Sequence, residues 1–148
     1  MPDRNENLVK RIDMAIHVQT LAAQHSIMVE FTLDEPSNGY HAQRNPRKIK
    51  IRPTKNTGFY VSALHEIGHI IGKHQTDNDP CQRLQSERRE IQEFWAWVWA
   101  KRNALAWTHT AERVMWGAMN SYGITEETLG NDLTEILTDA RTEELADA

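Results

Sequence analysis

The chain has a single cysteine, Cys81, in its 148 residues, so no disulfide can form within it. We therefore expect a reducing compartment, the cytoplasm. No apolar run approaches the length of about 20 residues that a membrane-spanning helix needs, and the first residues have no apolar signal core. One cysteine cannot form a cysteine-rich zinc site. Any metal ion would therefore have to be held by histidine and carboxylate side chains.

The remaining composition is that of an ordinary globular protein. Hydrophobic residues make up 39% and charged residues 26% of the sequence, which is far from a disordered composition. Repeats and low-complexity tracts are absent. We expect a single domain over residues 1–148, large enough for its own hydrophobic core.

Charge is unevenly distributed along the chain. Residues 124–148 hold eight acidic residues and one basic residue, whereas the net charge of the whole chain is −4. We expect this acidic segment to form a helix that frays toward its end. Six basic residues gather in one short region, namely Arg44, Arg47, Lys48, Lys50, Arg52 and Lys55. They resemble the exposed face of a strand and match no nucleic-acid-binding motif, so we do not expect nucleic acid as a partner.

Hydrophobic periodicity predicts several helices around a small sheet, an α+β fold. The expected strands cover residues 27–33 and 48–52, the second stopped by Pro53 and placed near a sheet edge. The expected helices cover residues 6–25, a stretch from residue 60 or 62, residues 80–107, a stretch from 108 or 110 to 122, and an acidic stretch after Thr125. Asp79 followed by Pro80 is a typical start for the third helix.

The most informative stretch is Leu64 to Gly72, with the sequence LHEIGHIIG. On a helix His65 and His69 lie one turn apart on the same face, so both imidazoles can reach one metal ion. Glu66 stands beside them, where a base would take a proton from a metal-bound water. The surrounding residues are apolar on nearly every side, so we expect a buried helix in which these polar groups need partners.

A catalytic zinc site needs a third protein ligand. His74 is one alternative, although an extended HExxHxxGxxH motif would require histidine at Gln75. The other alternative is a carboxylate from the next predicted helix. On a helical wheel Glu93 is centred on a face with Ala96, Trp97, Ala100 and Ala104, opposite a stripe of Leu84, Ile91, Trp95, Val98 and Leu105. Glu90 lies at the edge of the Glu93 face. We favour Glu93 and keep Glu90 open.

LHEIGHIIG followed by Glu93-Phe-Trp-Ala resembles the ImmA/IrrE-like family, small bacterial and phage zinc metallopeptidases with a glutamate as third ligand. The resemblance covers residues 49–100 and implies a zincin-like fold with an HExxH active-site helix. It also implies that an edge strand aligns an extended substrate, for which residues 48–52 are the expected strand. Trp97 departs from the family, which often has a polar residue there, and no helix-turn-helix segment is present.

These residues predict a zinc-dependent metalloendopeptidase that hydrolyses a protein or peptide substrate. His65, His69 and Glu93 would bind Zn²⁺, and Glu66 would activate the metal-bound water. Tyr60, His74 and His109 are the expected alternatives for an additional oxyanion donor. The competing interpretation is a non-catalytic, zinc-stabilised binding module, associated with DNA or a regulator in a phage or mobile element.

Overall fold

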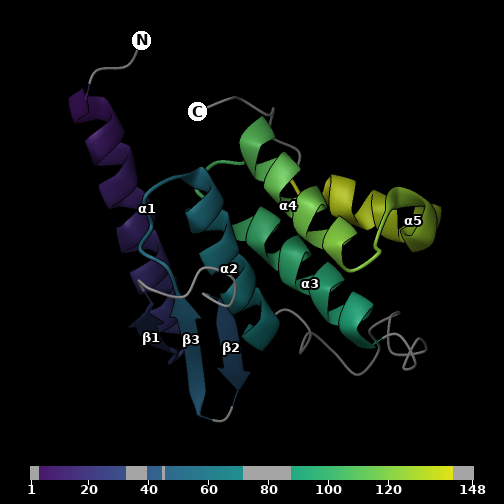
Figure 1. Ribbon diagram of the computed structural model, residues 1–148, viewed down its shortest axis with the longest axis horizontal. Helices are drawn as coiled ribbons and strands as arrows, with labels where there is room; N and C mark the ends of the chain where they lie inside the picture. Colours follow the sequence, from purple (N-terminus) through teal and green to yellow (C-terminus); the bar gives the residue numbers. More distant parts are fainter. Residues whose placement is uncertain (1–3, 33–39, 45, 72–87, 142–148) are drawn as a thin grey trace.

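The computed structural model describes residues 4–32, 40–44, 46–71 and 88–141 (Figure 1). These residues form five helices and three strands, in the order α1 (Arg4–Gln24), β1 (Met28–Phe31), β2 (His41–Arg44), β3 (Arg47–Ile51), α2 (Thr57–Ile71), α3 (Arg88–Asn103), α4 (His109–Ser121) and α5 (Glu126–Asp139). The predicted α+β class is confirmed. The start expected for the third helix, Asp79 and Pro80, lies outside the described residues.

Strand β3 is the central strand of a mixed sheet, with β1 parallel on one side and β2 antiparallel on the other. The prediction that residues 48–52 form an edge strand is therefore wrong. Pro53 lies two residues after Ile51, the last residue of β3 that pairs with β1. Its missing N–H therefore interrupts neither strand pairing of β3. Strand β2 is absent from the sequence-based prediction because HAQR has no apolar alternation. It pairs through the short connection that brings Arg44 opposite Arg47.

Helix α2 begins at Thr57, several residues before the predicted start. The side chain of Asn56 accepts a hydrogen bond from the backbone N–H of Phe59 at 2.9 Å. Asn56 therefore satisfies one of the free donors in the first turn and acts as an N-cap. Similarly, Thr108, one of the two residues at which the sequence predicts this helix to begin, caps α4, and Thr125 caps α5.

Helices α2 and α3 cross at very short range. A Cβ atom on Gly68 would lie 2.5 Å from the backbone oxygen of Ala96, which is closer than atoms can approach. Only glycine at position 68 allows this crossing, which explains a poor helix former in the middle of α2. This glycine therefore marks the close approach of α3 to α2.

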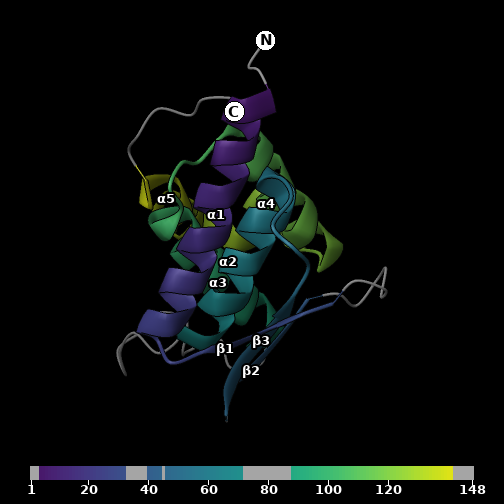
Figure 2. The same cartoon turned by 90° about the vertical axis from the view of Figure 1, so that its left-hand side faces the viewer.

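Helix α2 is the centre of the molecule. It packs against α3, α4, α1 and the sheet, and the sheet lies at one end beneath the helices (Figure 2). Helix α3 is buried on both sides, because every side chain from Phe94 to Lys101 is buried. No helix in the described ranges is long and apolar enough to span a membrane.

Helix α3 ends at Asn103 rather than near residue 107. The guanidinium of Arg141 donates hydrogen bonds to the carbonyl oxygens of Lys101 and Ala104, which occupies the acceptors at the helix end. The backbone N–H of Leu105 donates to the hydroxyl of Tyr60 instead of continuing the helix. Leu105, expected in the core stripe, lies past this end and is 53% exposed.

Candidate metal centre

His65 and His69 point the same way from consecutive turns of α2. Their ring centroids are 4.4 Å apart. The side chains are mostly covered, with relative exposures of 12% and 16%, so both rings lie at the edge of the core with a small opening to solvent. The predicted geometry of one shared helical face is therefore present.

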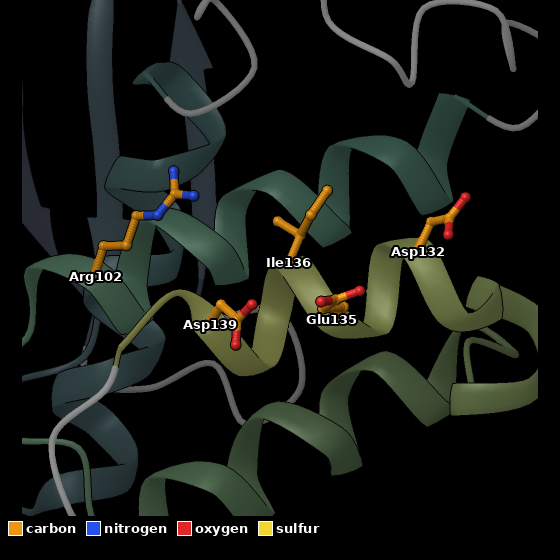
Figure 3. A pocket seen from close by; sticks show the side chains of 5 residues that line it. All are labelled: Arg102, Asp132, Glu135, Ile136 and Asp139. Carbon is orange, nitrogen blue, oxygen red and sulfur yellow. The ribbon is translucent and has the colours of Figure 1, made fainter.

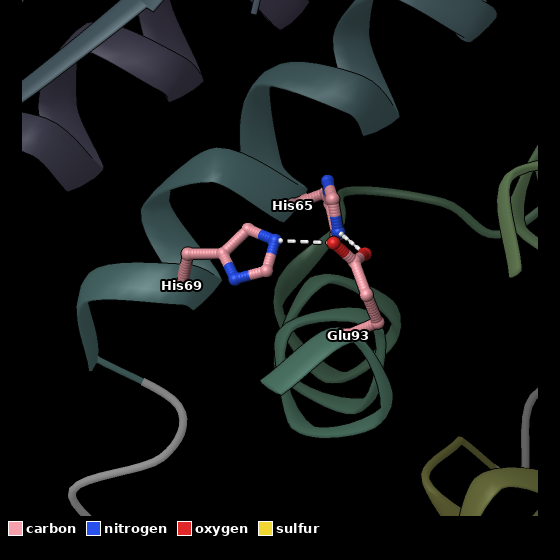
Figure 4. A group of neighbouring side chains, drawn as sticks. All are labelled: His65, His69 and Glu93. Atoms are coloured by element: carbon pink, nitrogen blue, oxygen red, sulfur yellow. Dashed lines mark hydrogen bonds and ion pairs between the residues drawn. The ribbon is translucent and has the colours of Figure 1, made fainter. Parts of the chain in front are cut away.

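Glu93 on α3 meets both imidazoles (Figure 4). Its Oε2 lies 2.6 Å from Nε2 of His65, and its Oε1 lies 3.1 Å from Nε2 of His69. The structure thus places Glu93, rather than Glu90, against the histidine pair. Glu90 is half-buried in the first turn of α3 and does not belong to this group.

The donor set fits a zinc ion. One ligand atom from each of His65, His69 and Glu93 lies within 4.8 Å of the others. Two ligands of a tetrahedral zinc ion are about 3.3 Å apart when each metal–ligand distance is about 2.0 Å. Nε2 of His65 and Oε2 of Glu93, 2.6 Å apart, would therefore have to separate by about 0.7 Å, whereas Nε2 of His69 and Oε1 of Glu93 already lie 3.1 Å apart, close to this distance. Two imidazoles and a carboxylate are also the donors of catalytic zinc sites, which leave one position open.

Protonation states at the centre suit a metal as well. Burial lowers the pKa of His65, against the opposing effect of Glu93. Burial raises the pKa of Glu93, but hydrogen bonds from both histidines more than offset this and bring it to about 2. At neutral pH His65 is consequently neutral and Glu93 ionised, the forms in which these side chains bind a metal ion.

Glu66 lies beside the ligands and is buried, with a relative exposure of 6%. Its Oε2 atom is buried without a hydrogen-bond partner in the part of the chain that the structure describes. Burial raises its pKa to about 7, with His69 lowering and Glu93 further raising it. A carboxyl group with this pKa can both accept and return a proton near neutral pH.

Trp97 lies flat against His65. The two rings are stacked, with centroids 4.2 Å apart and an interplanar angle of 17°. Trp97 is almost completely buried, so its packing restricts the orientation of the imidazole. Stacking therefore does here what a hydrogen bond to a polar neighbour does at many metal sites.

Tyr60 and His109, the expected oxyanion donors among the described residues, do not belong to the histidine and glutamate group. The hydroxyl of Tyr60 bonds to Nδ1 of His17 and to the N–H of Leu105. His109 is exposed at the start of α4, and His74 lies outside the described residues.

Sequence reasoning missed Tyr40, which immediately precedes β2. Its hydroxyl is buried and has no hydrogen-bond partner among the described residues. No sequence pattern distinguishes it from a loop tyrosine.

A shallow pocket lies elsewhere, between α3 and α5 (Figure 3). It is lined by Arg102 on α3 and by four residues of α5, namely Asp132, Glu135, Ile136 and Asp139. None of the metal-centre residues lines it.

Comparisons with protein-family models, with curated proteins and with solved structures found no match for this chain.

Proposed function

We propose that this chain is a zinc-dependent metalloendopeptidase with a zincin-like fold, related to the ImmA/IrrE-like family. The observation that carries the proposal is the convergence of His65, His69 and Glu93 from two helices, with the buried carboxyl of Glu66 next to them. A purely structural zinc site has four protein ligands and no use for an adjacent base.

His65, His69 and Glu93 would hold Zn²⁺ and leave room for solvent and substrate. A bound zinc ion polarises a carbonyl group and lowers the pKa of water. Oε2 of Glu66, which has no other partner among the described residues, accepts a proton from the attacking water. Glu66 then delivers that proton to the nitrogen of the leaving amine, so the C–N bond breaks without forming an amide anion.

Strand β2 is the proposed guide for an extended substrate. It is an edge strand of the three-stranded sheet and packs against α2, the helix that carries both histidines. Backbone groups along a free strand edge bind an extended peptide as an additional strand. In this role β2 takes the place of residues 48–52.

Two substitutions test the proposal. Glu66→Gln should keep bound zinc and lose hydrolysis of dye-labelled casein, because amide replaces the base without touching the ligands. Glu93→Gln should lose zinc affinity, because a carboxylate ligand is removed. Zinc content after dialysis and casein cleavage are the two measurements.

Glu90→Gln is the matched control, since it makes the same change one turn earlier on α3 and should alter neither measurement. Full zinc retention in Glu93→Gln would show that Glu93 is not the third ligand. Undiminished cleavage by Glu66→Gln would show that Glu66 is not the base.

A second candidate is a zinc-stabilised binding module without turnover. It is favoured by the direct contacts of Glu93 with both histidines, which join α2 to α3 even without a catalytic role. In that case the wild type binds zinc and gains stability, and neither casein nor any candidate partner is cleaved.

A further inference from the structure

Tyr40 presents a buried hydroxyl group that the fold does not use. Its side chain packs against the hydrophobic core, and its Oη atom has no hydrogen-bond partner within the described ranges. Buried tyrosine hydroxyls nearly always have a partner, since an unpaired polar group inside a protein is costly. An unpaired group of this kind indicates a ligand or solvent molecule that binds there.

Tyr40 lies next to an element that packs against the helix of the candidate metal centre. It leads directly into β2, which packs against α2. Burial raises the pKa of Tyr40 to about 12, Arg52 lowers it, and the carboxyl group of Glu66 raises it. Glu66 and Tyr40 therefore lie near enough for their charges to interact. The phenol keeps its proton at neutral pH, so it is a hydrogen-bond donor.

Two buried polar atoms without partners thus occur on neighbouring elements. One is the Oη atom of Tyr40 beside β2, and the other is Oε2 of Glu66 on α2. The first can donate and the second can accept. A hydrolytic site needs both kinds of group. A base takes a proton from the attacking water, and a donor binds the carbonyl oxygen of the substrate.

Two other possible donors are less suited to this role. Tyr60 bonds to His17 and Leu105. Nε1 of Trp97 is also unpaired within the described chain, but its ring is held flat on His65. Tyr40 is the hydroxyl group whose electrostatic neighbour is the proposed base.

We infer that the hydroxyl of Tyr40 donates a hydrogen bond to the oxygen of the reacting carbonyl group. The inference rests on the proposed peptidase function. When water adds to the carbonyl carbon, the C=O double bond opens and its oxygen becomes an oxyanion. Tyr40 stabilises that charge and keeps its own proton, while the proton of the water goes to Glu66. Collapse of the intermediate restores C=O and expels the amine.

A pair of probes tests this on the zinc-loaded full-length chain. Benzylphosphonate offers charged oxygen atoms to a donor, whereas phenylmethanethiol binds zinc through sulfur and offers no such oxygen. Tyr40→Phe should weaken benzylphosphonate binding by about 10- to 100-fold, the usual effect of removing one hydrogen bond to a charged group. It should leave phenylmethanethiol binding unchanged, with calorimetry as the measurement.

Stability and kinetics provide two further readouts. Because the hydroxyl of Tyr40 has no partner among the described residues, Tyr40→Phe should keep the melting temperature of the wild type. Casein cleavage should lose about 10²- to 10³-fold in kcat with little change in KM, since the bond forms only in the transition state.

Equal loss of both probes, or no loss of either, in zinc-loaded Tyr40→Phe would overturn the inference while leaving the peptidase proposal intact. A lowered melting temperature with unchanged benzylphosphonate binding would give Tyr40 a structural role instead. Absence of zinc binding by the wild type would overturn both proposals together.

Discussion

Burial acts differently on the ionisable side chains that meet where α2 crosses α3. It raises the pKa of Glu66 to about 7, because the lost hydration of this carboxyl group outweighs the lowering effect of His69. Glu93 is buried too, yet hydrogen bonds from two histidines keep its pKa at about 2. The two glutamates therefore differ in protonation: Glu66 can hold a proton near neutral pH, whereas Glu93 stays ionised.

Tyr60 gives a prediction on alkaline stability. Burial raises its pKa to about 12, partly opposed by the N–H of Leu105 and by Arg141. An unfolded tyrosine loses its proton near pH 10, so between pH 10 and 12 the folded state holds one proton more than the unfolded state. The contribution of Tyr60 to the free energy of unfolding is thus present below pH 10. It is lost by up to about 1.4 kcal/mol per pH unit as pH rises toward 12.

Tyr60→Phe should accordingly flatten the fall in the free energy of unfolding between pH 10 and 12. Urea denaturation at several pH values measures it. Equal slopes for wild type and Tyr60→Phe would contradict the assignment.

At the scale of elements, the crossing of α2 and α3 determines the ligand geometry. Gly68→Ala should destabilise the fold and weaken zinc binding, because its methyl group would overlap the backbone of Ala96 and push α3, with Glu93, away from the histidines. Overpacking of this kind costs about 1–3 kcal/mol. Urea denaturation and a zinc competition titration measure the two effects.

Gly117→Ala is the matched control. Gly117 lies within α4, and a Cβ atom there meets nothing within 4 Å in the described structure. Alanine should stabilise this helix by about 1 kcal/mol and leave zinc affinity unchanged. A Gly68→Ala variant as stable as Gly117→Ala would show that the helices can separate without penalty.

The sequence predicts the type of most elements because their signals are local. Apolar periodicity marks α1 and α2, and the alanine face of α3 singles out Glu93 as the carboxylate turned toward another helix. Strand β2 has no comparable signal, since only its pairing with β3 makes it a strand. The central position of β3 likewise depends on its pairing with β1 and β2, which lie on other segments of the chain.

Residues that depend on three-dimensional neighbours escape prediction for the same reason. Asn56 is an ordinary loop residue until its side chain accepts the bond from Phe59. Trp97 looks like a core tryptophan, and only the folded chain shows it stacked on His65. That His65, His69 and Glu93 bind zinc stays a prediction, although the structure brings the three together.

For the whole molecule, zinc and folding should be coupled. The proposed ligands come from two helices and meet only in the folded chain, so zinc would bind the folded state and stabilise it. At a free zinc concentration about 100 times Kd the free energy of unfolding should rise by about 2.7 kcal/mol. Urea denaturation with zinc and with a chelator measures the difference.

The rise should shrink strongly in Glu93→Gln and persist in Glu90→Gln. An equal rise in both variants would place the stabilising zinc ion elsewhere in the molecule.

The stacking of Trp97 on His65 also gives a spectroscopic signal for metal binding at the centre. An indole 4.2 Å from an imidazole senses any change in the charge or coordination of that ring. The ultraviolet emission of the chain should therefore change as metal enters, and substitution of Trp97 alone among the tryptophans should abolish that signal. The intrinsic fluorescence of Trp97 would thus report metal binding without an attached dye.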